Sequence, residues 1–277
     1  MMGMGEYALD MLGQMAPIAL VMVVIAIATK RERVFQAYRR CKQEGMTNFL
    51  LTATNTVLLA PLFALPSGAV QDAIGVPAVF NSWWQSLPAA LPIVGAIMLL
   101  DCTSYWRHRF EHNSAFWRFH ATHHADTALH WLSVMRKHPV ARFLSLIVDT
   151  LPALALGLPI WAIGIALLLR NWWAYFIHAD VPWTLGPASW VLISPAAHRL
   201  HHAREGELAG SNFGGFLSIW DRMFGTYVDP APHLDCETGI DEGTRSFLGE
   251  LARPFEGSSD KLGSWRFNQP ETGREVA

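Results

Sequence analysis

Charged residues are scarce in this chain of 277 amino acids: Asp, Glu, Lys and Arg together make up 16% of it, while hydrophobic residues make up 51%. A soluble domain usually carries about 25% charged residues, so the composition argues against a protein that is surrounded by water. The net charge of -2 gives no support for a nucleic-acid partner, and none is expected. The composition is typical of a membrane protein.

Cysteine is also rare. Cys41, Cys102 and Cys236 are widely separated and form no C-x-x-C pair. This pattern indicates neither a disulfide framework nor a zinc site built from thiolates. Tryptophan, by contrast, occurs twelve times, and indole rings favour the interface between membrane and water.

Long apolar runs predict membrane-crossing helices. The first covers about residues 7–29 and is long enough to cross a hydrocarbon core of roughly 30 Å. No basic segment precedes it and no small-residue cleavage site follows it, so a retained helix is expected and not a signal peptide. Further spans are expected at about residues 47–65 and 89–105.

The distribution of basic residues predicts the orientation of these spans. A basic cluster follows the first span directly: Lys30, Arg31, Arg33, Arg39, Arg40 and Lys42. The stretch 67–88 contains no Lys or Arg. Because basic residues beside a span favour the cytoplasmic side, we expect the N-terminus and residues 67–88 outside and the basic cluster inside.

A second apolar region, about residues 140–176, has Gly157, Leu158 and Pro159 near its middle. Glycine and proline interrupt helices there, so the region predicts two short spans that form a hairpin. A buried or re-entrant hairpin is the alternative. In either case both ends of the hairpin lie on the same side, and the segments before and after it can meet.

Nine of the twelve histidines fall into four short groups. They are His108 and His112; His120, His123 and His124; His178; and His198, His201 and His202. On a helix, residues four apart share one face, whereas adjacent residues diverge by about 100° and can reach different metals. Nine imidazoles are too many for one metal ion and suit two, and imidazole alone accepts zinc, iron or copper.

The order H-x-x-x-H, H-x-x-H-H, H-x-x-H-H resembles the fatty acid hydroxylase/sterol desaturase superfamily of integral membrane di-iron oxygenases. The resemblance covers about residues 95–230 and includes several flanking motifs. These are Asp101 with Tyr-Trp-x-His-Arg at 105–109, Trp-x-x-His at 117–120, Arg136-x-His138-Pro139, His-Ala-Asp at 178–180, Ser-Pro before the last group, Asn212-Phe213-Gly214, and Trp220-Asp221-Arg222.

The resemblance implies that the nine histidines hold two iron ions and that O2 is a co-substrate. It implies hydroxylation or desaturation of a lipid, a sterol or a related hydrophobic substrate. The chain has no His-Pro-Gly-Gly haem motif, so the electrons are expected from a separate protein, of the ferredoxin or cytochrome b5 type with its reductase. A bacterial inner membrane is the expected location, with the active site on the cytoplasmic side.

Four further residues are candidates for contacts around the metals. Asp101 is expected to accept a hydrogen bond from the far nitrogen of a ligand histidine, and His130, His138 and Asp180 are further candidates. His130 is a departure from the family pattern, since relatives often have asparagine there.

Two other carboxylates are placed by simpler arguments. Glu111 is expected to pair with a nearby arginine. Asp149 lies in an apolar run and is expected to point into the helix bundle, because a carboxylate that faces lipid is costly.

Together these patterns predict an all-α integral membrane protein with about four to five spans or half-spans and a cytoplasmic, histidine-rich cap that holds two metals. Three segments are expected: N-terminal transmembrane helices with a basic cytoplasmic loop (1–94), a catalytic domain similar to the superfamily (95–230), and a polar, exposed C-terminal tail (231–277).

Other functions stay open at this stage. Ether-lipid cleavage and carotenoid hydroxylation also begin with hydrogen abstraction and belong to the same class of enzyme. A non-catalytic membrane protein that binds or transports metal is the alternative from another class. Transport favours ionisable ligands near the middle of the membrane, whereas these histidines lie at the ends of the predicted spans.

Overall fold

The computed structural model describes residues 4–63, 67–204 and 206–256, and in these ranges every named secondary-structure element is a helix. Two isolated β-bridges, Leu192 with Leu217 and Ala203 with Thr238, are the only extended pairings in the described ranges. The expected all-α class is therefore confirmed.

Five long helices are joined by shorter ones. The long helices are α1 (Met4–Lys30), α2 (Val34–Phe63), α5 (Ala90–Glu111), α7 (Pro139–Ala155) and α8 (Ile160–Ile177). The short α-helices are α3 (Ser67–Ala73), α4 (Ala78–Ser86), α6 (Ser114–His124), α9 (Pro195–His201), α10 (Gly206–Ala209), α11 (Ile219–Met223) and α12 (Phe247–Ala252). The 3-10 turns are η1 (Arg31–Arg33), η2 (Trp131–Met135), η3 (Gly186–Trp190), η4 (Ala231–His233) and η5 (Arg253–Phe255).

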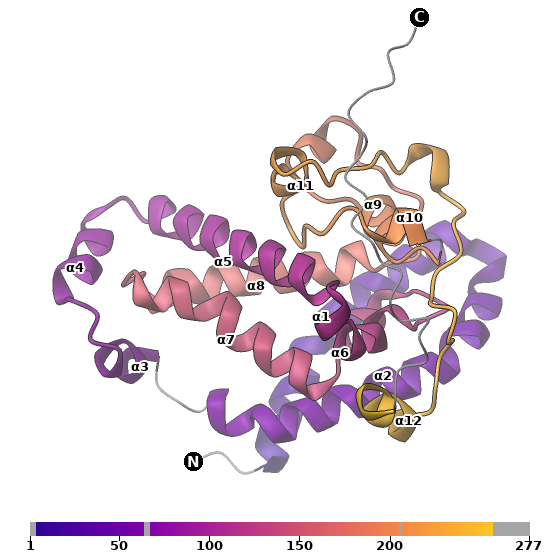
Figure 1. Cartoon of the computed structure of the whole chain (residues 1–277), viewed down its shortest axis with the longest axis horizontal. Coiled ribbons are helices and arrows are strands. Elements are labelled where there is room, and N and C mark those ends of the chain that lie inside the picture. The colour runs from indigo at the N-terminus through magenta and orange to yellow at the C-terminus, as the bar shows by residue number, and fades with distance from the viewer. Residues whose placement is uncertain (1–3, 64–66, 205, 257–277) are drawn as a thin grey trace, which may run out of the picture.

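Helices α7 and α8 both pack against α5 (Figure 1), and small residues take part in their common contact, beside Leu100, Leu158 and Ile163. Ala96 of α5, Ala153 of α7 and Ala166 of α8 are fully buried in one cluster. Small side chains let helix backbones approach closely, which is how helices associate in lipid. In Figure 1, α3 and α4 lie at one end of this bundle, and α6 and α9 to α11 lie at the other.

The outer faces of the long helices are apolar. Leu20, Val24, Leu58, Val94 and Leu168 are each between 53% and 66% exposed. Soluble monomers rarely expose so much apolar surface, and such a surface marks contact with another apolar phase. By length and composition, Ile160–Ile177 is the one helix within the described ranges that could cross a membrane.

The predicted hairpin is present as α7 and α8, and the break lies where Gly157 and Pro159 interrupt the chain. Gly157 has φ +67°, and a Cβ atom there would lie 2.9 Å from Cβ of Phe80 in α4. Only glycine adopts this conformation at low cost and tolerates this close approach. Helix α4 also holds the turn, because Trp84 Nε1 donates a hydrogen bond to the carbonyl of Leu156 at 3.0 Å.

The segments outside the predicted spans also contain helices. The basic cluster lies at the end of α1, in η1 and in the first turns of α2. Residues 67–88 contain α3 and α4. The C-terminal segment was expected to be an exposed tail, yet Glu250 in α12 is fully buried and Arg253 is 8% exposed; the part of that tail from 257 to 277 lies outside the described residues.

The turn at Gly157 gives a test of the fold. Gly157→Ala is expected to lower the free energy of unfolding by about 1–3 kcal/mol, because a side chain at positive φ is strained and its Cβ meets α4. Thermal unfolding of the purified protein in detergent measures the change. Gly164→Ala, in α8 with nothing within 4 Å of the added Cβ, is the matched control and is expected to leave the melting temperature unchanged or slightly raised. Equal melting temperatures for the two variants would contradict the role of Gly157.

Candidate metal centre

The ends of four helices carry the histidine groups. His112 caps the C-terminus of α5, and α6 begins at once, with Asn113 as its N-cap and its side chain accepting from the Ala115 amide at 3.1 Å. The tight connection brings α6 back against α5. Ser194 caps α9 in the same way and accepts from the Ala197 amide at 3.1 Å.

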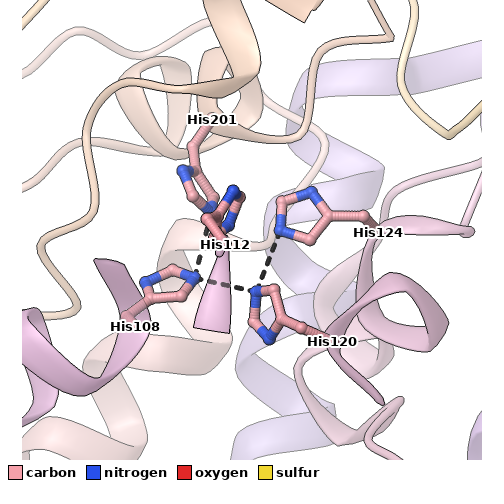
Figure 2. Close-up of side chains that lie close together, drawn as sticks. All are labelled: His108, His112, His120, His124 and His201. Atoms are coloured by element: carbon pink, nitrogen blue, oxygen red, sulfur yellow. Dashed lines mark hydrogen bonds between the residues drawn. The ribbon is translucent and has the colours of Figure 1, made fainter. Parts of the chain in front are cut away.

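The structure brings all nine histidines together and divides them into two groups. The first group is His108, His112, His120, His124 and His201, and the second is His123, His178, His198 and His202. Within each group the nitrogen atoms that could bind a metal lie within 4.8 Å of one another. Figure 2 shows the five rings of the first group converging from separate elements.

Adjacent histidines go to different groups, as the helical spacing predicts. His123 belongs to the second group and His124 to the first; His201 belongs to the first group and His202 to the second. Each H-x-x-H-H motif therefore contributes to both groups, and neither motif can complete a group by itself. The two groups share one buried region, with the rings of His124 and His202 stacked at 4.4 Å between centroids.

Backbone carbonyls fix the orientation of four rings through Nδ1. His108 donates to Phe213 at 2.8 Å, His201 to Ser211 at 2.7 Å, His178 to Ala174 at 2.7 Å, and His123 to Arg136 at 3.2 Å. A hydrogen on Nδ1 leaves a lone pair on Nε2 of a neutral ring. The Nε2 atoms of these rings are therefore available as ligands.

A carboxylate does the same for a fifth ring. Glu111 lies 3.0 Å from Nδ1 of His120 and 2.7 Å from Arg107. Burial alone would raise the pKa of this carboxyl, but Arg107 and His120 lower the pKa to about 2. Glu111 is therefore ionised and accepts the His120 hydrogen. The expected pairing of Glu111 with an arginine is present, and its bond to His120 was not foreseen.

These hydrogen bonds make the first group fit a cation. Nε2 of His108 lies 3.1 Å from Nε2 of His120 and 3.0 Å from Nε2 of His201. With hydrogens on all three Nδ1 atoms, the lone pairs of three neutral rings face one another and no hydrogen lies between them. A bound metal ion converts this repulsion into coordination.

Unpartnered nitrogens support the same conclusion in both groups. Nε2 of His112 in the first group and Nε2 of His202 in the second are buried without a hydrogen-bond partner in the described part of the chain. A buried polar atom without a partner costs about 1–3 kcal/mol. Both residues belong to a group whose potential ligand atoms lie within 4.8 Å of one another.

Burial keeps the imidazoles neutral. Burial lowers the pKa of His178 and of His201 to about 3. It also lowers the pKa of three further rings well below the usual value, and neighbouring imidazoles add to the effect; these rings are His108, His124 and His202. Neutral imidazole is the form that binds a metal. The site is thus prepared for metal at neutral pH.

The expectation for Asp101 is wrong. Its carboxylate accepts hydrogen bonds from the Leu217 amide at 2.8 Å and from Trp220 Nε1 at 3.1 Å. It also lies 3.2 Å from Nε of Arg170. Nδ1 of His108 donates to the backbone carbonyl of Phe213 instead. Asp101 therefore anchors the segment around 217–220 and contacts no histidine of either group.

The three other candidates also lie outside the two groups. His130 contacts the carbonyl of Ala128 at 2.9 Å. His138 caps α7, and its Nε2 donates to the carbonyl of Leu251 at 3.3 Å. Asp180 is 41% exposed at its side chain and pairs with Lys30 and Arg199.

Two more carboxylates support the site from a distance. Asp221 accepts from the amides of Phe213 at 2.7 Å and Gly214 at 2.9 Å, and so positions the carbonyl that holds His108. Asp149 points into the bundle, as predicted, and binds Arg107 through both oxygens at 2.7 and 3.1 Å.

Arg136 connects the second histidine motif to distant parts of the chain. It is fully buried, its carbonyl holds His123, and its Nε donates to the carbonyl of Thr122 at 2.8 Å. Its guanidinium also pairs with Glu44 of α2 and with Glu250 of α12, at 2.5 Å for the second. Helix α12 therefore helps to hold Arg136, whose carbonyl accepts the hydrogen bond of His123.

Comparison with known proteins agrees with this geometry. Residues 93–226 match the family model described as fatty acid hydroxylase. The ornithine lipid hydroxylase OlsE of Rhizobium tropici is 30% identical over 183 residues, which are 62% of this chain and 53% of that protein. An alkylglycerol monooxygenase of Xenopus tropicalis is 33% identical over 149 residues, 53% of this chain and 30% of that protein.

A more distant relative is the Delta(7)-sterol 5(6)-desaturase of Candida dubliniensis, which is 28% identical over 164 residues, 58% of this chain and 40% of that protein. The chain spans about half the length of the first of these relatives and less of the others. No solved structure matches the chain. The matches confirm the resemblance to the fatty acid hydroxylase/sterol desaturase superfamily.

The bond between Glu111 and His120 gives a test of the site. Glu111→Gln removes the charge that orients this ring, and the affinity for metal is expected to fall about 10–100-fold, as for other partners of ligand histidines. Iron retained by the purified protein against increasing chelator measures the change. Asp241→Asn, at a carboxylate that is 90% exposed, is expected to retain iron as the unchanged protein does. If Glu111→Gln retains iron equally well, this carboxylate does not serve the metal site.

Proposed function

We propose that this chain, whose residues 93–226 match the fatty acid hydroxylase family model, is a membrane-bound oxygenase that uses two iron ions to hydroxylate or desaturate a hydrophobic substrate. The observation that carries the proposal is the division of nine neutral, converging imidazoles into two groups. His108, His112, His120, His124 and His201 would hold one ion, and His123, His178, His198 and His202 the other.

Iron is preferred to other metals because the relatives that share this domain are named hydroxylases, a monooxygenase and a desaturase. Such reactions consume O2 and electrons. When bound, the ions would supply the activation of O2. The electrons would come from a separate electron-transfer protein, of the ferredoxin or cytochrome b5 type.

The chain's own residues supply position and exclusion of water. The backbone carbonyls of Phe213, Ser211 and Arg136 fix ring orientation, and Glu111 fixes His120. Eight of the nine histidines are buried, so bulk water is kept from the reacting atoms. No side chain among the nine needs to transfer a proton, because each is held neutral and directed at a metal.

The substrate class follows from the relatives and from the surface. The curated relatives are named for an ornithine lipid, an alkylglycerol and a sterol, and all three are hydrophobic compounds. The exposed apolar faces of the long helices favour a location within a bilayer. We therefore propose a lipid substrate that enters from the membrane. We also propose N-terminal transmembrane helices at 1–94, the catalytic domain at 95–230 and a C-terminal segment at 231–277.

Loss of one histidine tests the function. His202→Ala opens a ligand position in the second group and is expected to lower bound iron and to abolish O2-dependent product, since geometry and affinity both suffer. His233→Ala, outside both groups, is the matched control and is expected to preserve both. The readouts are iron content of the purified variants and lipid mass spectrometry of cells that express them, where one oxygen gained or two hydrogens lost identifies the reaction.

Full iron and full product in His202→Ala would contradict the two-metal site. Full iron with no product in the unchanged protein, across lipid extracts with an added reductase system, would favour a non-catalytic metal-binding protein. These two outcomes are separable because iron content is measured independently of product.

The orientation in the membrane is a further part of the proposal. The basic residues at 30–42 and the absence of Lys and Arg from 67–88 support a histidine centre on the cytoplasmic side of the membrane. The membrane that we propose is a bacterial inner membrane. Reporter domains fused at Ser82 and after Val228 are expected to report opposite sides, Ser82 outside and Val228 inside. If both report the same side, the number of spans is wrong.

A further inference from the structure

A line of aromatic side chains connects the first histidine group to the protein surface. The buried ring of Phe213 lies 5.0 Å from the ring of His112 and 5.4 Å from the ring of His201, measured between centroids. Tyr105 is also fully buried, and its ring lies 6.3 Å from that of Phe213. Trp106 lies 5.5 Å from Tyr105 and is 46% exposed. Ring contacts therefore run without a break from the histidines to an exposed indole.

The hydroxyl group of Tyr105 begins a chain of hydrogen bonds. Its oxygen lies 2.9 Å from Oγ1 of Thr226, and Oγ1 of Thr226 lies 2.7 Å from Oδ1 of Asp221. A hydroxyl carries one hydrogen, and an ionised carboxylate only accepts. Thr226 therefore donates its hydrogen to Asp221, and Tyr105 donates its hydrogen to Thr226. The phenol is thus connected to a carboxylate through one hydroxyl group.

Asp221 is able to receive a proton through this chain. Burial raises the pKa of its carboxyl to about 6, although the hydrogen bonds from Thr226, Gly214 and Phe213 oppose the rise. The carboxylate is therefore mainly ionised at neutral pH. A group whose pKa lies close to the surrounding pH both takes up and returns a proton readily.

A purely structural role accounts for part of this arrangement. A buried tyrosine usually finds a hydrogen-bond partner for its hydroxyl group, and Thr226 is such a partner. The structural role does not account for a phenol in ring contact both with Trp106 at the surface and with the Phe213 ring beside the histidines. Phenol and indole are the aromatic side chains that give up one electron most readily, and a phenol does so most easily when its proton leaves as well.

We propose that Tyr105 is a redox-active residue that exchanges electrons with the first histidine group and with Trp106. The inference rests on the proposed function, because O2 would oxidise metal held by those histidines even when no substrate is bound. Tyr105 then gives one electron to the oxidised metal. Its proton moves to Thr226 while the hydrogen of Thr226 moves to Asp221.

The cycle closes from the surface. Trp106 gives one electron to the oxidised Tyr105, and the proton returns from Asp221 through Thr226. A one-electron reductant in solution, such as the electron-transfer protein, then reduces Trp106. The net result is the passage of one electron from the reductant to the metal, with no change in the side chains. The ligand histidines are thereby spared from oxidation, a side reaction that an oxidising site must avoid.

The first experiment looks for the oxidised side chain. The full chain is loaded with iron, reduced, mixed with O2 without substrate and frozen for electron paramagnetic resonance. A tyrosyl radical is expected, and its signal narrows when the protein contains ring-deuterated tyrosine. Tyr105→Phe is expected to lose this radical at unchanged iron content. Tyr175→Phe, at a buried tyrosine of α8, is the matched control and is expected to keep it.

The second experiment tests the proton route. Thr226→Val removes the hydroxyl group, and the yield of the radical is expected to fall about tenfold, as the loss of one hydrogen bond provides. Thr226→Ser is expected to restore the yield, which a merely structural effect of the substitution would not predict. Asp221 is left unchanged, because it also accepts from the amide of Phe213.

The third experiment needs neither iron nor O2. The histidines are filled with zinc, which imidazole also binds and which is not oxidised. Azide radicals made by pulse radiolysis oxidise exposed tryptophans, and the absorption of tryptophan and tyrosine radicals is followed with time. A part of the electron transfer from tyrosine to tryptophan is expected to disappear in Trp106→Phe and, to the same extent, in Tyr105→Phe.

The proposal is overturned by a radical that survives in Tyr105→Phe, or by electron transfer that neither substitution reduces. Product formation by the unchanged protein without a radical at Tyr105 also overturns it. The proposed function fails differently. Transfer between Trp106 and Tyr105 in the zinc form, with neither radical nor product in the iron form, supports the exchange between the two residues and contradicts the oxygenase.

Discussion

Nine imidazoles held neutral in one buried region are the constraint on which the rest of this structure depends. With hydrogens on Nδ1 of His108, His120 and His201, three Nε2 lone pairs meet at 3.0–3.1 Å. Such an arrangement is unfavourable without a cation and favourable with one. The rings stay in place because each of these Nδ1 hydrogens is committed to an acceptor that the fold supplies.

Most of those acceptors are backbone carbonyls, so the metal centre depends on the path of the chain. Phe213 and Ser211 lie in the segment after α9, and Asp221 fixes that segment through two amides. Arg136 holds His123 and is itself held by Glu44 and Glu250. Helices α2 and α12 therefore both help to fix the orientation of the His123 ring, through Arg136. A backbone carbonyl accepts the hydrogen bond of a ring without adding a negative charge. The site would therefore be strongly positive with metals bound.

The division between apolar and polar parts follows from the same requirement. The bundle of α5, α7 and α8 packs through small residues and exposes apolar side chains outward, while ion pairs and histidines gather at one end of it. Arg107 connects the two parts, because it binds Asp149 of α7 and Glu111 at the end of α5.

The sequence by itself determined that long apolar helices form, where the break at Gly157 to Pro159 lies and how adjacent histidines separate into two groups, because hydrophobic runs, turn residues and helical spacing are local properties. The partners of the polar side chains were decided only by the tertiary structure. Asp101 has the spacing of a histidine partner yet binds Leu217 and Trp220, and Glu111 takes the role because the turn at His112 returns α6 to it. Likewise Glu250, in a segment that reads as a polar tail, is buried because Arg136, 114 residues earlier, needs a counter-charge. Such pairs depend on which distant segments meet, and no local pattern contains that information.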